Sequence, residues 1–231
     1  MTATVNKPLV VRTVVRTVAR IILLIFLVCP ITQAESLRIA VASNFKPVMQ
    51  LISHEFSALH QINLVVSSGS SGTIFAQIVH GAPFDVFLSA DSMRPLNLEE
   101  RDLTIAGSRS VYAIGRLVLW VPKNKLVEQS SLQRLNTPLA IANPILAPYG
   151  AAAMQVLTSL SLESKTVVTG NSVNQAFSFV ATGNAKAGLV SLSQMNAAKV
   201  SPEQYWLIST ELHQPIRQEL VALKNANVNH K

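Results

Sequence analysis

Short apolar runs alternate along the chain with longer segments whose apolar residues recur every three or four positions. The runs at residues 37–42, 62–66 and 85–89 have the length and composition of buried strands. Between them, residues 45–59 and 74–79 show the period of amphipathic helices. This order predicts a parallel sheet with helices on both faces, because parallel neighbours need a crossover connection.

The same alternation restarts after an apolar segment at 109–121 that contains Gly115. A second series follows, with predicted strands at 139–142, 166–168 and 187–190 and predicted helices near 131–135, after 150 and at 172–181. The apolar, β-prone run at 216–223 predicts a return to the first series. We therefore predict an α/β protein of two lobes, one formed by residues 35–115 with the return segment 217–231 and the other by residues 116–216.

The N-terminus has the pattern of a signal peptide: a basic start, an apolar run at 21–28, and small residues before Ala34. We predict that residues 1–34 are removed by cleavage after Ala34. Cys29 is also compatible with a lipoprotein signal, although Val28 before it is not small. Cleavage would leave 15 basic against 12 acidic residues and no cysteine. The high net charge is therefore no argument for nucleic acid, and disulfides and thiolate metal sites are excluded.

A stretch of five hydroxyl residues and two glycines, residues 67–73, joins a predicted strand to a predicted helix. The first N–H groups of a helix lack intrahelical acceptors, and hydroxyls add donors without adding charge. The stretch lacks the Gly-Lys-Ser/Thr ending of a phosphate-binding P-loop. By itself it is better explained as an ordinary helix cap and turn, since serine and glycine before a helix more often have that role.

Three other strand–helix junctions repeat this construction, at residues 42–44, 147–150 and 171–173. None of the four stretches contains Lys or Arg. In open α/β sheets, ligands bind beyond the carboxyl ends of the strands, where helix N-termini converge. A pocket of uncharged donors without a carboxylate favours a fully deprotonated tetrahedral oxyanion, which only accepts hydrogen bonds.

Three motifs in this chain resemble those of the periplasmic molybdate-binding proteins of ABC importers. They are Val41-Ala42-Ser43-Asn44, Ser70-Ser71-Gly72-Thr73 with Gln77-Ile78, and Gly81-Ala82-Pro83-Phe84-Asp85-Val86-Phe87-Leu88-Ser89-Ala90-Asp91. The similarity runs from about Leu37 to Leu223. It implies the type II periplasmic-binding-protein fold, in which two lobes, each a mainly parallel sheet flanked by helices, are joined by two crossing hinge segments and close on molybdate or tungstate.

The resemblance also implies a set of ligand-binding residues. Ser43 and Ser71 would supply hydroxyl and backbone donors from the first lobe, with Asn44 as a further candidate donor. Tyr149 and Val173 would supply backbone N–H groups from the second lobe. The metal would be bound only as molybdate, through the contacts of Ser43, Ser71, Tyr149 and Val173 with its oxygens, and no other cofactor is expected.

One position departs from the family pattern. The family often places a tyrosine after the strand that corresponds to 187–190, and its phenol reaches the oxyanion; here Ser191 stands there. We expect the contact from Ser191 to be shorter, replaced or lost. Tyr149 stands where relatives often carry Ala, and one hypothesis is that it compensates.

Together these observations predict a periplasmic solute receptor that is not an enzyme. It would capture molybdate or tungstate and deliver it, as a monomer, to the membrane permease of an ABC importer, with no nucleic acid partner. The alternatives are a receptor for sulfate, phosphate or a small organic anion, and a secreted hydrolase. A hydrolase would need a nucleophile with a base, but no serine motif here contains a histidine and Gly-x-Ser-x-Gly is absent.

The last eight residues, 224–231, have one clearly apolar side chain and cannot form an amphipathic helix. The family resemblance implies a further helical hairpin packed on the first lobe after the strand at 216–223. We therefore expect apolar surface to be exposed on that lobe, and a protein of marginal stability.

Overall fold

The computed structural model describes residues 36–224. The predicted signal peptide and the tail that follows Lys224 lie outside these residues. Cleavage after Ala34 and the expected effect of the short tail therefore stay predictions.

The first lobe is built on a five-stranded sheet whose spatial order differs from its chain order. The order is β2-β1-β3-β10-β4, with β1 at Ser36–Ala42, β2 at Asn63–Gly69, β3 at Val86–Ser89, β4 at Ser110–Gly115 and β10 at Ile216–Ala222. Strand β1 runs parallel to β2 and β3, whereas β10 runs antiparallel to β3 and β4. The run at 216–223 thus returns to the first series, as predicted.

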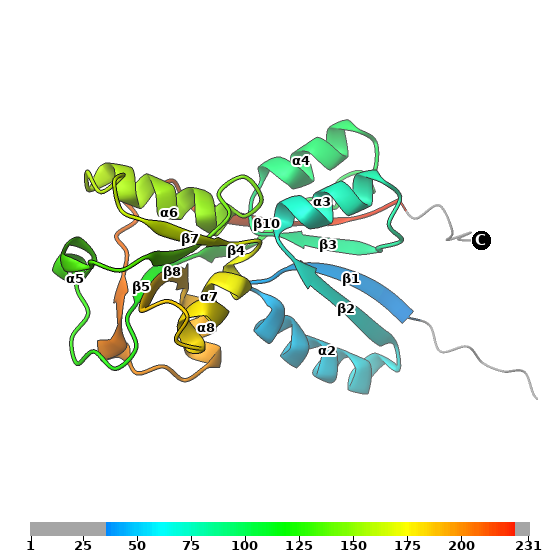
Figure 1. The fold of residues 1–231 in the computed structure, drawn as a ribbon. Coiled ribbons are helices and arrows are strands. Elements are labelled where there is room, and N and C mark those ends of the chain that lie inside the picture. Colours follow the sequence, from blue (N-terminus) through cyan, green and yellow to red (C-terminus); the bar gives the residue numbers. More distant parts are fainter. Residues whose placement is uncertain (1–35, 225–231) are drawn as a thin grey trace, which may run out of the picture. The chain divides into compact units, whose positions relative to one another are not determined.

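Three helices cover the two faces of this sheet. They are α2 at Lys46–His60, α3 at Ser71–Val79 and α4 at Met93–Glu100. Helix α2 lies on one face and α3 and α4 lie on the other (Figure 1). Successive side chains of β1 face opposite ways, so Ala40 packs in the cluster with α3 and α4 while Ile39 and Val41 pack with Met49 of α2.

The second lobe repeats this plan around another five-stranded sheet. Its order is β7-β6-β8-β5-β9, with β5 at Leu117–Trp120, β6 at Leu139–Ala142, β7 at Val167–Gly170, β8 at Ala187–Ser191 and β9 at Tyr205–Leu207. The helices are α5 at Gln129–Arg134, α6 at Pro148–Ser159, α7 at Val173–Ala181 and α8 at Leu192–Ala197, followed by the 3₁₀ turn Pro202–Gln204. Helix α6 covers one face of the sheet, and α7 and α8 cover the other (Figure 1).

Two segments cross between the sheets. Gly115 ends β4 in the first sheet, and Leu117 begins β5 in the second; the return runs through residues 208–215 from β9 to β10. Strands β5 and β10, which follow the crossings, pair antiparallel with their neighbours. Each sheet is therefore mixed, with its parallel pairs formed by the strand–helix–strand units.

Strand β2 is longer than the apolar pattern predicts. The run was expected to end at residue 66, but Ser67, Ser68 and Gly69 continue the ladder opposite Ala40, Val41 and Ala42 of β1. Backbone pairing with an adjacent strand overrides the weak strand propensity of serine and glycine. The polar stretch thus contributes to a helix start only from Ser70, whose hydroxyl caps α3 by accepting from the N–H of Thr73 at 3.2 Å.

Within residues 36–224, none of the helices is both long and apolar enough to cross a membrane.

Candidate functional site

Hydrogen bonds from one lobe to the other bring two of the four predicted stretches together, residues 42–44 and 171–173. The N–H of Asn174, at the start of α7, points to the hydroxyl of Ser43 at 3.4 Å. The hydroxyl of Ser193, at the start of α8, donates to the carbonyl of Asn44 at 2.7 Å. The loop after β1 therefore lies against the N-termini of two helices of the second lobe, as expected for a site at the carboxyl ends of parallel strands.

The other two stretches, residues 67–73 and 147–150, lie at a second contact between the lobes or directly beside it. The N–H of Gly72, in the first turn of α3, donates to the carbonyl of Leu146 at 2.9 Å. The guanidinium of Arg94, which forms an ion pair with Asp91, donates to the carbonyl of Ile145 at 2.9 Å. The loop that precedes α6 thus docks onto the first turns of α3 and α4.

The hydroxyls of Ser43 and Ser71 are oriented by backbone groups. Ser71 accepts a hydrogen bond from the N–H of Ala90 at 2.9 Å, and Ser43 faces the N–H of Asn174. Both serines are buried. A hydroxyl that accepts from an N–H keeps its own hydrogen to donate, so each serine can present one O–H to an acceptor in the site.

The second lobe contributes the starts of α6 and α7. Tyr149 is the second residue of α6 and Val173 is the first residue of α7, and both are buried. The first N–H groups of a helix have no intrahelical acceptor and carry partial positive charge. Gly150 allows the close approach of α6 to β6, since a Cβ there would lie 2.3 Å from the carbonyl oxygen of Ala142.

The phenol of Tyr149 is directed to the first crossing segment. Its hydrogen-bonding neighbours are the backbone of Arg116 and the side chains of Asn44 and Gln218. The phenol oxygen lies so close to Gly115 that a Cβ added to this glycine would be 2.6 Å from it. Burial raises the pKa of Tyr149 far above its ordinary value, so the phenol stays neutral. The side chain of Tyr149 thus packs at the hinge, while its backbone belongs to the start of α6.

The hydroxyl of Ser191 is engaged in capping α8. It lies 2.9 Å from the hydroxyl of Ser193 and donates to Oε1 of Gln194 at 2.9 Å, and the N–H of Ser191 also points to that oxygen. Ser193 gives its own hydrogen to the carbonyl of Asn44. The hydrogen of Ser191 therefore has acceptors within the cap, unlike those of Ser43 and Ser71.

Two buried glutamines of this region were missed by the sequence reasoning. Gln194 lies in the first turn of α8, within 3.4 Å of the carbonyl of Val173, and Gln218 lies on β10, within 2.8 Å of the side chain of Asn44. Gln218 carried no distinct signal, because it stands between two other polar residues, Arg217 and Glu219, in the segment predicted as the return strand. No pattern marked Gln194, because α8 itself was not predicted.

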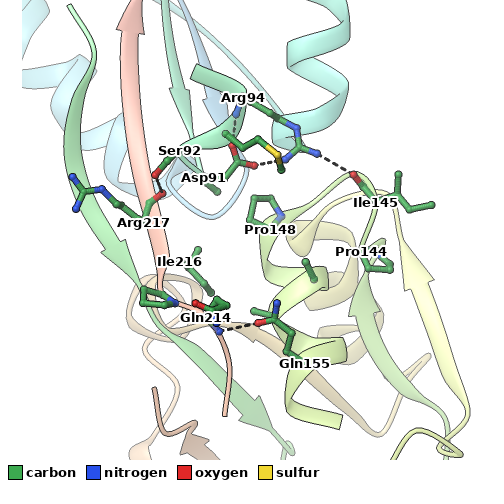
Figure 2. A pocket seen from close by; sticks show the side chains of 15 residues that line it. Asp91, Ser92, Arg94, Pro144, Ile145, Pro148, Gln155, Gln214, Ile216 and Arg217 are labelled. Carbon is green, nitrogen blue, oxygen red and sulfur yellow. Dashed lines mark hydrogen bonds and ion pairs between the residues drawn. The ribbon is translucent and has the colours of Figure 1, made fainter. Parts of the chain in front are cut away.

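A cavity of about 350 Å³ lies beside this region, between the starts of α4, α6 and β10 (Figure 2). Pro148 and Arg94 line it, together with Ile216 and Arg217. Among the described residues, the lining of this cavity includes none of the six candidate ligand residues, which are Ser43, Asn44, Ser71, Tyr149, Val173 and Ser191. In the described range 36–224, no three His, Cys, Asp or Glu side chains lie together where they could hold a metal ion.

Comparisons with known proteins bear on the family and the fold of the chain rather than on individual site residues. The model of a family described as bacterial extracellular solute-binding protein matches residues 37–231. The molybdate-binding protein ModA of Azotobacter vinelandii is 43% identical over 204 residues, which cover 85% of this chain and 81% of that protein. ModA of Rhodobacter capsulatus is 41% identical over 192 residues, or 80% of this chain and 75% of the relative.

A solved structure extends the similarity to the fold. The periplasmic molybdate-binding protein of Azotobacter vinelandii aligns with a TM-score of 0.78 at 40% identity, over 83% of this chain and 87% of that chain. The resemblance inferred from the three motifs, and the two-lobed periplasmic-binding-protein fold that it implied, are thereby confirmed.

Proposed function

The chain belongs to the family of bacterial extracellular solute-binding proteins, and we propose that it captures molybdate or tungstate in the periplasm for the permease of an ABC importer. Proteins of such a family bind and release a solute, so this protein is not an enzyme. The observation that carries the proposal is a buried set of uncharged donors contributed by both lobes of a chain whose relatives are molybdate-binding proteins. Because one chain contains both lobes, we propose that it acts as a monomer.

The proposed ligand set consists of neutral hydrogen-bond donors. The hydroxyls of Ser43 and Ser71 and the amide of Asn44 would come from the first lobe, and the N–H groups of Tyr149 and Val173 from the second. Each hydrogen bond to a charged acceptor contributes about 1.5–3 kcal/mol net. Several such bonds support micromolar or tighter binding after the cost of association.

Molybdate and tungstate are expected to raise the melting temperature of the protein without its predicted signal peptide, and hydrogen phosphate much less. The reason is that hydrogen phosphate carries a proton for which this donor set offers no carboxylate acceptor. Thermal unfolding in the presence of molybdate, tungstate, sulfate or phosphate measures this directly. Equal shifts for all four anions would contradict the proposed selectivity, and no shift with any of them would contradict the proposed function.

Replacing Ser191 by alanine is expected to lower stability more than affinity. Its hydroxyl caps α8, and the loss of such a cap costs about 1 kcal/mol of the free energy of unfolding. The hydroxyl hydrogen of Ser191 already has acceptors within the cap, so its removal should change the affinity for the anion little. Calorimetric titration with molybdate, combined with thermal unfolding of the free protein, separates the two effects. An affinity loss larger than that of Ser71→Ala would make Ser191 a direct ligand contact instead.

A further inference from the structure

The side-chain amide of Asn44 is buried with only one of its two ends paired. The residue is 2% exposed, and its Nδ2 donates to Oε1 of Gln218 at 2.8 Å. Its Oδ1 has no hydrogen-bond partner among the described residues. A buried acceptor left unpaired is costly, and an oxygen presented to a deprotonated anion would repel it. Asn44 can donate to an anion only if its nitrogen takes the place of this oxygen.

Gln218 connects Asn44 to both lobes. It is 3% exposed on β10. Its Oε1 lies 3.0 Å from the hydroxyl of Tyr112, which in turn lies 3.0 Å from the carbonyl of Ser89. The amide nitrogen of Gln218 lies near the phenol of Tyr149. A Cβ added to Gly115 would lie within 3.0 Å of both the amide nitrogen and the phenol oxygen. The amide of Gln218 is therefore held between two phenols and Asn44.

Turning both amides by half a turn pairs the oxygens of both amides and both phenols in this network, and leaves the amide nitrogen of Asn44 for the ligand. Nε2 of Gln218 would then donate to Oδ1 of Asn44 and to the oxygen of Tyr112, whose own hydrogen goes to the carbonyl of Ser89. Oε1 of Gln218 would accept from the phenol of Tyr149. The amide nitrogen of Asn44 would occupy the position that its unpaired oxygen holds now. Such a rotation exchanges donor and acceptor without changing the volume of either side chain.

We infer that Gln218 is a positioning residue that decides which end of the Asn44 amide faces the bound anion. With Nε2 of Gln218 toward Asn44, the nitrogen of Asn44 faces the ligand and favours an oxyanion without a proton. With Oε1 of Gln218 toward Asn44, the oxygen of Asn44 faces the ligand and favours an anion that carries one. This inference rests on the proposed function and names the device by which that site selects its ligand class.

The substitution Gln218→Glu tests this orientation directly. A carboxylate can only accept, so it holds the nitrogen of Asn44 toward itself and leaves the oxygen toward the ligand. Molybdate and hydrogen phosphate both carry two negative charges at mildly alkaline pH, so the added charge of Glu penalises them alike. We expect the ratio of molybdate to phosphate affinity, measured by calorimetric titration and by competition, to fall by about tenfold or more. Parallel losses for the two anions would overturn the inference.

A second variant and a second background complete the test. In an Asn44→Ala background, Gln218→Glu should leave the affinity ratio unchanged, because its effect passes through Asn44; a ratio that still falls would overturn the inference. Gln218→Leu, which neither donates nor accepts, should lower the ratio by a smaller factor. If the Glu variant does not fold, Gln218→Leu replaces it in the test. An unchanged ratio of molybdate to phosphate affinity in Gln218→Leu would then overturn the inference.

Exposed Gln77 on α3 provides the matched control, since Gln77→Glu adds the same charge away from the network. It should leave the ratio unchanged; a fall as large as that of Gln218→Glu would overturn the inference. Failure of the wild-type protein to bind molybdate would instead refute the proposed function. The two failures are therefore distinguishable.

Discussion

Ser71→Ala is expected to weaken molybdate binding by about 1–3 kcal/mol, which is about 5- to 150-fold. The substitution removes the O–H that we propose donates to the anion. It also leaves the N–H of Ala90 without the acceptor that it has at 2.9 Å. Because Ser71 is buried, water cannot easily take the place of its hydroxyl, either as acceptor for the N–H of Ala90 or as donor to the anion. Calorimetric titration of the purified variant with molybdate measures the loss.

Ser43→Ala should cause a loss of the same size, because the hydroxyl of Ser43 has the same arrangement with the N–H of Asn174. Ser53 of α2 is a matched control: its hydroxyl donates to the carbonyl of Met49, in its own helix, at 2.7 Å. Ser53→Ala is expected to leave the affinity unchanged. Wild-type affinity in Ser71→Ala and Ser43→Ala would remove both serines from the ligand set.

Gly72→Ala is expected to lower the affinity for molybdate by about tenfold without lowering the melting temperature of the ligand-free protein. A Cβ at this position would lie 2.9 Å from the carbonyl oxygen of Leu146 and 3.0 Å from the guanidinium of Arg94. The added methyl group therefore obstructs the contact of the two lobes around the site. Within α3 itself, alanine is the better helix former. Binding and stability should thus change in different directions.

Calorimetric titration and thermal unfolding, each with and without molybdate, test the effect of Gly72→Ala. The control is Gln77→Ala, an exposed position on the same helix, which should change neither quantity. Unchanged affinity in Gly72→Ala would show that close contact between α3 and the loop before α6 is not needed for tight binding. A large loss of stability in the free protein would show that the contact is part of the fold rather than of ligand binding.

Local pattern was sufficient for most of the elements. The helices at Lys46–His60 and Ser71–Val79 and the strands of the two parallel units follow from periodicity and apolar runs, because those signals depend only on near neighbours in the chain. Helix α4, strand β9 and helix α8 were not among the predicted elements. Strand β9 has three residues and helix α8 has six, and elements so short owe their stability to packing.

The sequence predicted which stretches of the chain form the candidate site, but not which atoms of those stretches can donate to a ligand. The sequence by itself determined where hydroxyls and helix starts follow strands, and so which parts of the chain could supply donors. Only the tertiary structure decided that the hydrogens of Ser43 and Ser71 are free to donate while that of Ser191 has acceptors within a cap. It alone placed Gln218 against Asn44, 174 positions away. Donor direction depends on the partner of each group, and those partners come from distant segments that only the folded chain brings within hydrogen-bonding distance.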